Sequence, residues 1–265
     1  MKTVFVTGAT KNTGWAIARR FASLGWNVVI SSRNEASAAE AAKNLKAEFP
    51  SVETLGVGMD PARVADIRAA FGRIRETFGR LDAFVNCAAH LGVGMSILST
   101  SPDDYDALMA ANVRGPFFCV QEAVRLMTDG GSVTFISSCH ALKSVPGRIC
   151  YTVSKAAVGG MVRSLAVELG PLGIRANAIL AGAIRTDRWD PLSPEEVQER
   201  RDRYPAGKES SPDEIAAAVA FLASDEARTV TGVEMPVDSG IGVCLLKYNK
   251  NWIQNDPYNV KYWEK

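Results

Sequence analysis

The 265-residue sequence predicts an α/β fold, a single doubly wound domain whose parallel seven-stranded sheet carries helices on both faces. The length suits one large α/β domain better than two small ones. Short apolar segments alternate with longer amphipathic segments along the chain, which is the order of βαβ units. The short segments are rich in β-branched residues and apolar on both faces, which is typical of buried parallel strands.

Seven segments have this strand character, at residues 4–6, 28–30, 52–57, 83–85, 133–136, 176–179 and 233–237. Helical patterns lie between them, near residues 14–24, 35–48, 62–78, 102–128, 151–170 and 213–223. Two of these helices open with the same signature, a capping serine followed by proline and two acidic residues, at 101–104 and 211–214. The crossovers between parallel strands are expected to be right-handed.

Two regions interrupt this alternation within the predicted domain and after it. Residues 1–241 are predicted to form the domain. Within it, residues 186–210 are charged and contain Trp189 and three prolines. This composition predicts a mobile substrate flap with a short helix at 194–203. Residues 242–265 follow the last strand and are too aromatic for a plain disordered end. We expect this tail to pack on a pocket or at a subunit interface.

The composition argues against several classes of partner and site. Lysine and arginine number 30 against 29 acidic residues, so the net charge is only +1 and no strongly basic surface is available for nucleic acid. The five cysteines contain no CxxC pair, which argues against a zinc site and a disulfide framework. No signal peptide or membrane-spanning stretch is evident. We therefore expect a cytoplasmic protein without a metal, a nucleic-acid partner or a membrane contact.

A glycine-rich turn joins the first strand to the first helix. Glycines in such a turn let phosphate groups approach backbone amides, and the helix N-terminus adds partial positive charge. In an alternating α/β chain this position favours a Rossmann-type dinucleotide site over an ordinary strand-to-helix turn. The predicted binding residues in this turn are Gly8, Thr10, Lys11, Asn12, Thr13 and Gly14.

The end of the second strand indicates which dinucleotide is bound. An acid about 20 residues after the glycine turn would hold a ribose 2′-hydroxyl, but the segment Ser31-Ser32-Arg33-Asn34 contains none. Arg33 and Lys11 are cations that can pair with a 2′-phosphate, so Ser32 and Arg33 join the predicted site and NADP(H) is favoured over NAD(H). The alternative is that both cations are solvated surface charges. Asp60, after the third strand, either contacts the adenine region or caps the next helix.

A tyrosine and a lysine lie four residues apart in a helical segment, so both are on one face. A free tyrosine has a pKa of about 10, and a lysine ammonium beside it would stabilise the phenolate and lower that pKa. These residues are Tyr151 and Lys155. Ser138, directly after a predicted strand, is placed to hold a substrate oxygen near the phenol. The tyrosine–lysine pair alone would indicate packing, whereas together with the glycine turn it predicts proton transfer beside a nicotinamide.

Together, these features resemble the short-chain dehydrogenase/reductase family over roughly residues 2–240. The family's Tyr-x-x-x-Lys motif and its serine match Tyr151, Lys155 and Ser138. Further matches, in chain order, are the strand end Asn86-Cys87-Ala88-Ala89, the helix asparagine Asn112, the segment 181–186 and the segment 237–240.

The resemblance implies a role for each matched residue. Tyr151 would protonate a carbonyl oxygen or deprotonate an alcohol, and Lys155 would hold the ribose hydroxyls and lower the tyrosine pKa. Ser138 would orient the substrate oxygen, and Asn112 would distort its helix and hold a water that relays protons from the lysine. The remaining cofactor contacts implied are Asn86, Ala88, Gly182, Ile184 and Thr186.

Three positions depart from the family pattern. Asn12 stands where the phosphate turn usually has its middle glycine, and asparagine tolerates the left-handed backbone better than most residues. Thr13 could compensate by donating its hydroxyl to a phosphate. Ala89 replaces the last glycine of the Asn-Asn-Ala-Gly motif, and Ala181 replaces a proline. None of these changes removes a reacting group.

The loops expected around the substrate are polar and basic, and their candidate residues are His140, Arg148, Arg185 and Trp189. A steroid or a long acyl chain would need a more apolar lining, so we expect a small polar or anionic carbonyl compound or alcohol. The small-residue stretch at 156–161 would permit close helix packing between subunits. Because the family commonly forms dimers and tetramers, a homotetramer or homodimer is expected.

Three alternatives accompany this interpretation. A catalytically silent NADP(H)-binding sensor would keep the fold, but Ser138, Tyr151 and Lys155 are all present. An enoyl reductase of the same family spaces its tyrosine and lysine more widely than the four residues found in this sequence. An NAD(H)-dependent alcohol or sugar dehydrogenase would follow if Arg33 and Lys11 do not contact the cofactor.

Overall fold

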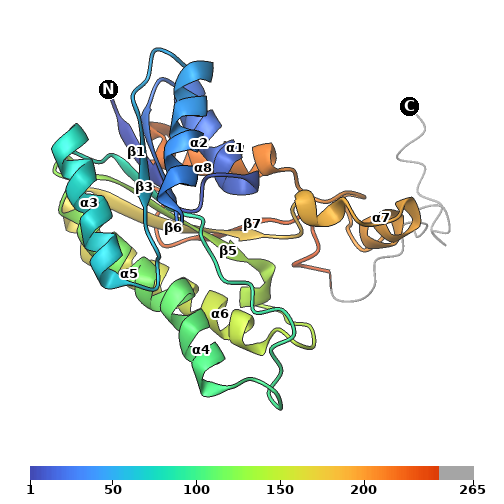
Figure 1. Cartoon of the computed structure of the whole chain (residues 1–265). Coiled ribbons are helices and arrows are strands. Elements are labelled where there is room, and N and C mark those ends of the chain that lie inside the picture. Colours follow the sequence, from blue (N-terminus) through green and yellow to red (C-terminus); the bar gives the residue numbers. More distant parts are fainter. Residues whose placement is uncertain (245–265) are drawn as a thin grey trace.

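In the computed structural model, which describes residues 1–244, seven strands form one all-parallel sheet in the order β3-β2-β1-β4-β5-β6-β7 (Figure 1). The strands are β1 (Thr3–Val6), β2 (Asn27–Ser32), β3 (Thr54–Gly58), β4 (Ala83–Asn86), β5 (Gly131–Ser138), β6 (Ile174–Ala181) and β7 (Glu234–Val237). The predicted doubly wound fold is confirmed. Except for its first three residues, the predicted tail at 242–265 lies outside the described residues.

The helices lie between the strands as the alternation predicts. The α-helices are α1 (Asn12–Ser23), α2 (Glu35–Glu48), α3 (Val64–Phe78), α4 (Pro102–Met109), α5 (Gly115–Val124), α6 (Ile149–Leu169), α7 (Pro194–Arg201) and α8 (Pro212–Ala223). A π-helical segment, η1 (Ala110–Arg114), joins α4 to α5. The short 3₁₀ segments are η2 (Cys139–Ala141), η3 (Gly170–Leu172), η4 (Asp187–Trp189) and η5 (Asp225–Ala227).

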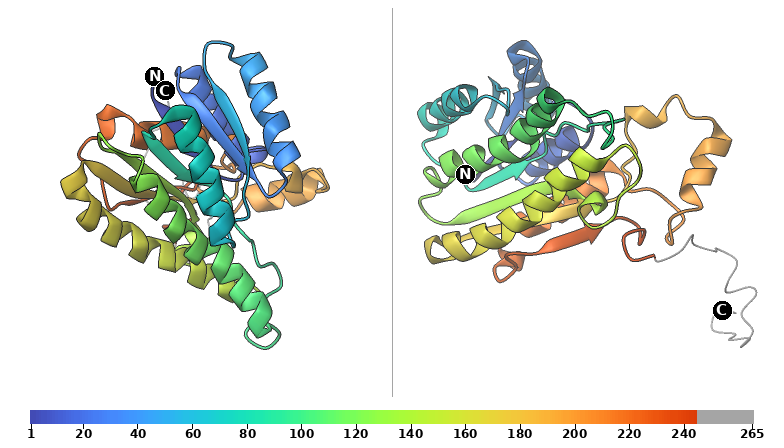
Figure 2. Two further views of the ribbon diagram at one scale, coloured as in Figure 1. Left: turned by 60° about the vertical axis from the view of Figure 1, so that its left-hand side comes forward. Right: turned by 90° about the horizontal axis from the view of Figure 1, so that it is seen from below.

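Two layers of helices bury the two faces of the sheet (Figure 2). One hydrophobic core joins α1, α2 and α8 to the sheet, and a second core joins α3, α5 and α6 to the opposite face. Phe5 and Phe84 from the sheet pack with Phe71 of α3 in the second core, with Phe5 and Phe71 in edge-to-face contact at 5.2 Å between ring centroids. Such packing of aromatic rings fixes the positions of the strands that carry the site.

The structure extends and divides some of the predicted elements. Strands β5 and β6 pair over eight residues each, from Gly131 opposite Ile174 to Ser138 opposite Ala181, so both are longer than predicted. The helix predicted at 102–128 is divided by η1, and the helix predicted from residue 62 begins at Val64. The β5–β6 extension brings Ser138 to the carboxyl edge of the sheet.

Both serine-capped helix starts have the expected hydrogen bonds. Ser101 Oγ accepts from the backbone N–H of Asp104 at 3.1 Å at the start of α4. Ser211 and Glu214 form a reciprocal capping box at the start of α8. Each cap satisfies backbone donors that the first helical turn leaves without a partner, which fixes where the chain enters the helix.

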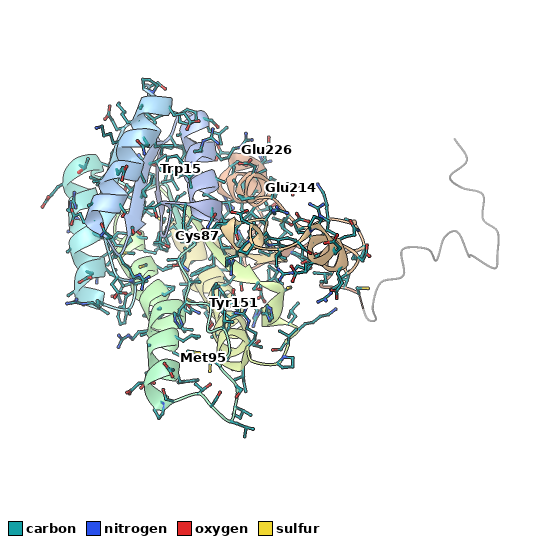
Figure 3. The ribbon with its side chains drawn as sticks, turned by 45° about the vertical axis from the view of Figure 1, so that its right-hand side comes forward. Trp15, Cys87, Met95, Tyr151, Glu214 and Glu226 are labelled. Carbon is teal, nitrogen blue, oxygen red and sulfur yellow. The ribbon has the colours of Figure 1, made fainter. Side chains whose placement is uncertain are left out.

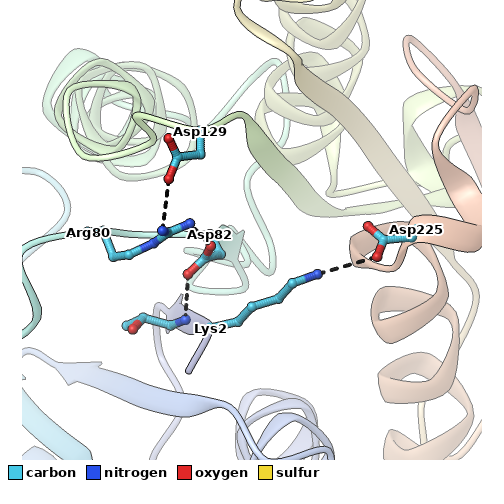
Figure 4. A network of polar contacts seen from close by, with 6 residues as sticks. Lys2, Arg80, Asp82, Asp129 and Asp225 are labelled. Atoms are coloured by element: carbon cyan, nitrogen blue, oxygen red, sulfur yellow. Dashed lines mark hydrogen bonds and ion pairs between the residues drawn. The ribbon is translucent and has the colours of Figure 1, made fainter.

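Ion pairs hold the amino edge of the sheet, opposite the predicted site (Figure 4). Arg80 binds Asp82 and Asp129, which precede β4 and β5, and Lys2 pairs with Asp225 of η5 at 3.7 Å. The first residue of β1 also donates its backbone N–H to Asp82 at 2.8 Å. This network connects the starts of three adjacent strands and leaves the carboxyl edge for ligand binding.

Candidate active site

The predicted catalytic residues meet at the carboxyl edge of the sheet. Ser138 ends β5, while Tyr151 and Lys155 lie one turn apart on α6, which packs against η2 and β6. All three side chains are buried. Figure 3 labels Tyr151 of α6 and Cys87, just after β4, and both lie toward the middle of the face shown.

The Tyr151 phenol lies against charged and polar groups. Burial raises its pKa, and a hydrogen bond with Ser138 and the positive charges of Arg148 and Arg188 oppose that rise. The Lys155 Nζ lies 5.5 Å from the centroid of the tyrosine ring. The sequence predicted that the lysine lowers the tyrosine pKa. In this structure the tyrosine pKa is raised instead, because burial of the phenol is the largest effect.

Lys155 is held by the sheet rather than by the tyrosine hydroxyl. Its Nζ donates to the carbonyl oxygen of Ile136 in β5 at 2.9 Å. Burial lowers the pKa of the Lys155 ammonium to about 8, and only 3% of the residue is exposed. A lysine with this pKa exchanges its proton near neutral pH, so it can take part in a proton relay.

Asn112 lies in the π-helical segment η1, as the resemblance implied for a distorted helix. Its Oδ1 accepts from the backbone N–H of His90 at 2.7 Å, and its Nδ2 donates to the His90 carbonyl oxygen at 2.8 Å. The same Nδ2 donates to Ser154 Oγ at 3.1 Å, and Ser154 in turn donates to the carbonyl oxygen of Tyr151. Asn112 thus connects the loop after β4 to the catalytic helix.

The glycine turn has the backbone that phosphate binding requires. Asn12 adopts a left-handed backbone with φ of 52°, so asparagine fulfils the conformational role of the missing glycine. A Cβ on Gly14 would lie 2.4 Å from the carbonyl oxygen of Gly8, so only glycine allows α1 to approach the turn this closely. Thr13 is buried in the first turn of α1, and Thr10 lies in the turn itself.

Lys11 is held by an acid that sequence reasoning did not assign to the site. Its Nζ donates to Asp187 Oδ2 at 2.8 Å, and Asn12 Nδ2 donates to the other carboxylate oxygen at 3.1 Å. The hydrogen bond from Lys11 lowers the pKa of the Asp187 carboxyl. Asp187 belongs to η4, so the glycine turn and the segment after β6 are joined across the site. Lys11 was predicted beside a 2′-phosphate, but in this structure Asp187 is its partner.

The residues predicted to bind the adenosine half lie after β2 and β3. Arg33 is exposed and forms no ion pair with any described residue. Ser32 Oγ accepts from the backbone N–H of Asn34 at 3.3 Å, and Asp60 Oδ1 accepts from Ala62 N–H at 3.0 Å. Asp60 therefore stabilises the turn before α3, while the N-cap position of that helix is Arg63, so the hydrogen bond of Asp60 is not a helix cap.

The predicted cofactor residues after β4 are held by a residue that the sequence analysis left without a role. Thr7 Oγ1 accepts from the backbone N–H groups of Cys87 and Ala88 at 3.0 and 3.1 Å. It donates to Asn86 Oδ1 at 3.4 Å. Thr7 stands directly before Gly8, the first glycine of the turn. This position in the sequence could have indicated that Thr7 belongs to the predicted cofactor site. The ends of β1 and β4 are thereby connected beside the glycine turn.

The segment after β6 contains a buried polar atom that bears on whether a nicotinamide cofactor fits the predicted site. Thr186 Oγ1 is buried and has no hydrogen-bond partner among the described residues. A buried hydroxyl without a partner is unfavourable and indicates a ligand contact. Gly182 donates its N–H to the Val237 carbonyl oxygen, and Ile184 forms a backbone bridge with Ser210, so the backbone that leads to Thr186 is held by two other segments. Together with the close approach of Gly14 to the Gly8 carbonyl oxygen in the glycine turn, this arrangement fits the predicted dinucleotide.

The predicted flap at 186–210 contains α7, and stacked and paired side chains within residues 185–209 hold its parts together. Trp189 is buried, and the guanidinium carbons of Arg185 and Arg200 lie 5.6 and 5.2 Å from its ring centroid. Glu209 binds Arg201 with two hydrogen bonds of 2.8 Å and pairs with Arg185 at 3.7 Å. The hydrogen bonds from Arg201 lower the pKa of Glu209 to about 2. The contacts of Arg185 and Trp189 thus hold the flap.

Two further predicted substrate residues border Tyr151. The rings of His140 and Tyr151 meet edge to face, with centroids 5.7 Å apart and planes at 76°. The Arg148 guanidinium carbon lies 5.9 Å from the Tyr151 ring, and its Nη1 donates to the Leu91 carbonyl oxygen at 2.8 Å. Burial, together with the charge of Arg148, lowers the pKa of His140. These residues are therefore close to the tyrosine that the sequence predicts as catalytic.

Comparison with known proteins agrees with this geometry. The sequence model of a family described as "Enoyl-(Acyl carrier protein) reductase" matches residues 8–242. An L-rhamnose 1-dehydrogenase (NAD(P)(+)) of Azotobacter vinelandii is 36% identical over 255 residues, covering 92% of this chain and 98% of that protein. The chain belongs to the short-chain dehydrogenase/reductase family. It is therefore an oxidoreductase that acts on alcohols or carbonyl compounds with a nicotinamide cofactor.

Solved structures of this family have the same fold. A short-chain dehydrogenase/reductase from Serratia marcescens is similar with a TM-score of 0.84 and 31% identity, covering 91% of this chain and 98% of that one. A blue fluorescent protein from a metagenomic library, in complex with NADPH, has a TM-score of 0.83 and 34% identity, covering 91% and 97%. Among residues 1–244, this short-chain dehydrogenase/reductase has no helix long and apolar enough to cross a membrane.

Proposed function

We propose that this short-chain dehydrogenase/reductase is an NADP(H)-dependent oxidoreductase of a small polar or anionic carbonyl compound and its secondary alcohol. The observation that carries the proposal is the position of Tyr151, buried between Ser138 and Lys155 at the carboxyl edge of the sheet. When bound, the cofactor supplies the hydride to the carbonyl carbon or accepts it from the alcohol. The chain has to supply the proton and to hold the substrate oxygen.

Each side chain in this proposal has a defined task. Tyr151 gives its hydroxyl proton to the carbonyl oxygen, and Ser138 donates a hydrogen bond to the same oxygen. Lys155, with a pKa lowered to about 8 by burial, is the proton source for the tyrosine, and because its Nζ binds the Ile136 carbonyl oxygen the proton passes through an intervening hydroxyl or water. Asn112 fixes the loop after β4 against α6, so the proton path keeps its geometry. In the oxidation direction the proton moves the opposite way along these groups.

The preference for NADP(H) rests on the end of β2. No acid stands there to repel a 2′-phosphate, and Arg33 is exposed without an ion-pair partner among the described residues. The blue fluorescent protein named above binds NADPH, which supports the choice, whereas the L-rhamnose dehydrogenase is described with NAD(P)(+). One observation favours NAD(H) as a second candidate, because Asp187 binds Lys11.

Among the predicted substrate residues we retain His140 and Arg148, which border Tyr151. Arg185 and Trp189 are omitted, because the ion pair with Glu209 and the arginine stacking already use their polar and aromatic surfaces. The silent-sensor alternative has no structural support, since the proton-transferring groups are buried together. The four-residue spacing of Tyr151 and Lys155 favours carbonyl chemistry over enoyl reduction.

We also propose a homotetramer or homodimer in the cytoplasm, with α5 and α6 at the subunit contact. Phe117 on α5 and Val153 and Val167 on α6 are exposed apolar side chains, and burying them against a second copy would be favourable. Light scattering coupled to size-exclusion chromatography measures the mass directly. A particle of 28.5 kDa, the mass of one chain, would contradict this proposal.

The test of the function is a turnover screen of carbonyl compounds with NADPH and NADH, followed at the nicotinamide absorbance. Arg33→Ala is the matched cofactor variant, and Arg20→Ala, an exposed arginine of α1, is its control. We expect the wild type to favour NADPH by at least about tenfold in kcat/KM, since a phosphate–guanidinium pair contributes about that much. Arg33→Ala should remove most of this preference. Equal use of both cofactors by the wild type would contradict NADP(H) specificity, and absence of turnover with either cofactor would contradict the function.

A further inference from the structure

A polar pair beside Tyr151 has no role in the proton transfer described above. His140 lies on η2, two residues after Ser138, and Arg148 directly precedes α6, three residues before Tyr151. The His140 ring centroid is 5.7 Å from that of Tyr151, and the Arg148 guanidinium carbon is 5.9 Å from it. Two hydrogen-bonding groups therefore face the tyrosine from two different segments.

His140 carries a buried atom without a partner. Its Nδ1 is inaccessible to solvent and forms no hydrogen bond with any described residue, whereas its backbone N–H donates to Ser138 Oγ at 3.2 Å. Burial lowers the pKa of His140, with a further contribution from the charge of Arg148, so the imidazole is neutral near pH 7. A neutral imidazole can donate one hydrogen bond and accept one. Leaving such an atom without a partner is costly, which indicates that a ligand supplies the missing bond.

Arg148 is fixed in position, and its charge is not neutralised. Its Nη1 donates to the Leu91 carbonyl oxygen at 2.8 Å, and its backbone bridges to Met95, so the loop after β4 fixes it in place. Within residues 1–244 it has no carboxylate partner, while Arg185 and Arg201 both pair with Glu209. A guanidinium has five donors in a planar fork, so donors remain after the bond to Leu91.

The acidic side chain that acts on this region does not neutralise the arginine. Besides burial, the charge of Asp238 contributes to raising the pKa of the thiol of Cys139, the residue before His140. The two carboxylate oxygens of Asp238 accept from the backbone N–H groups of Gly240 and Gly242 at 2.9 and 2.8 Å. Arg188 adds a second positive charge that acts on Tyr151. The electrostatic environment around the phenol is therefore suited to an anion, and the fork of Arg148 matches the two oxygens of a carboxylate.

We propose that Arg148 and His140 bind the carboxylate of a short hydroxy acid, or of the corresponding oxo acid, whose reacting oxygen lies against Tyr151 and Ser138. This inference rests on the proposed oxidoreductase function and names its substrate class. Arg148 supplies the charge and the paired donors, and His140 supplies one further hydrogen bond through its imidazole Nδ1, which has no partner among the described residues. The carboxylate lies within a few bonds of the carbinol carbon, because both binding groups border the tyrosine ring.

The experiment compares acids with uncharged analogues of the same shape. The probes are 2-hydroxybutanoate, 3-hydroxybutanoate and the methyl ester of each, oxidised with NADP⁺ or NAD⁺. We expect the wild type to favour one of the acids over its ester by at least about tenfold in kcat/KM. The two acids distinguish a carboxylate adjacent to the carbinol carbon from one that is a bond further away.

Variants show whether Arg148 acts on the carboxylate or on the tyrosine. Arg148→Gln should lower kcat/KM for the preferred acid about 100-fold and change that for its ester less than about threefold. His140→Leu should lower the acid value about tenfold, and Arg148→Lys should retain part of the activity. Arg228→Gln, an exposed arginine near η5, is the matched control and should leave both values unchanged.

Each failure has a distinct meaning. A wild type that oxidises the esters as well as the acids keeps the oxidoreductase function and overturns the carboxylate site. Equal losses for acid and ester in Arg148→Gln also overturn it, because the arginine would then act by positioning Tyr151. If neither acids, esters nor neutral alcohols are oxidised, the proposed function fails. Calorimetric titration of the acids into the NADPH-saturated protein then decides the site: absence of binding overturns it, and binding lost in Arg148→Gln supports it.

Discussion

The Lys11 ammonium and the Asp187 carboxylate lie 2.8 Å apart, although 176 residues separate them in the sequence. Lys11 belongs to the glycine turn, and Asp187 belongs to η4 after β6, so the pair joins the predicted phosphate turn to the segment after β6. Both side chains remain largely exposed. Such a pair contributes little to folding, but it places a negative charge where anionic phosphates have to approach.

Asp187→Asn should therefore bind NADPH more tightly, with the Kd lowered about threefold to tenfold. The substitution removes the carboxylate that repels phosphate and releases Lys11 to pair with the cofactor. Fluorescence titration measures the Kd, and a thermal melt should change little. Asp225→Asn is the matched control, because Asp225 pairs with Lys2 at the opposite edge of the sheet (Figure 4). A weaker affinity in Asp187→Asn would mean that the pair holds the bound cofactor in place.

Tyr151→Phe should lower kcat by a factor of about 10² to 10⁴ and leave NADPH affinity within about twofold. The variant keeps the ring that contacts His140 but removes the hydroxyl that transfers the proton. Tyr105→Phe, on the exposed surface of α4, serves as the control. Turnover that survives in Tyr151→Phe would exclude the tyrosine as the proton donor.

Lys155→Met should abolish turnover and stabilise the fold near pH 7. The folded pKa of Lys155 is about 8 and its ordinary value is 10.5, so between these values the unfolded chain binds more protons. Wild-type stability therefore rises with pH across this window, and the buried charge costs about 3 kcal/mol below it. The gain in Lys155→Met should fade as the pH rises from 8 toward 10.5.

Denaturant unfolding at pH 7 and pH 10 checks this expectation, with Lys43→Met on the exposed surface of α2 as the control. A Lys155→Met protein less stable than the wild type at pH 7 would show that the bond to the Ile136 carbonyl oxygen outweighs the desolvation of the ammonium.

Asn112→Ala should destabilise the fold by about 2–4 kcal/mol. It removes three hydrogen bonds and leaves the backbone N–H and carbonyl oxygen of His90 and the buried hydroxyl of Ser154 without this partner. The melting temperature should fall by several degrees, at about 2–4 °C per kcal/mol for a domain of this size. Asn44→Ala, exposed on α2, is the control. An unchanged melting temperature would mean that water replaces the asparagine amide.

The positions of the candidate catalytic side chains in the fold were predictable because each depends on short-range regularities. Tyr151 and Lys155 share a helix face through their four-residue spacing, and Ser138 follows a run of apolar strand residues. Parallel strands bring their carboxyl ends to one edge, so these local features converge without knowledge of the packing. The left-handed backbone of Asn12 was anticipated for the same reason, since it depends on one turn.

The contacts of the flap were not predictable, because the irregular segments between its short helices leave the directions of its side chains undetermined by helix or strand periodicity. Trp189 and Arg185 were predicted as substrate residues, and the structure adds that Arg185 lies on Trp189 and pairs with Glu209. The sequence does not indicate which arginine pairs with Glu209, because several arginines of this segment could do so. The choice depends on the path of the chain after β6.

The sequence by itself determined the α/β class, the order of the elements, the glycine turn and the positions of the reacting groups, because helix and strand periodicities and turn chemistry act over a few residues. Only the tertiary structure decided that Asp187 binds Lys11, that Thr7 holds the loop after β4, and that His140 keeps a buried atom without a partner. Burial likewise set the pKa of Lys155. These properties depend on distances between distant segments and on exclusion of water, and both arise only when the sheet and its helices pack together.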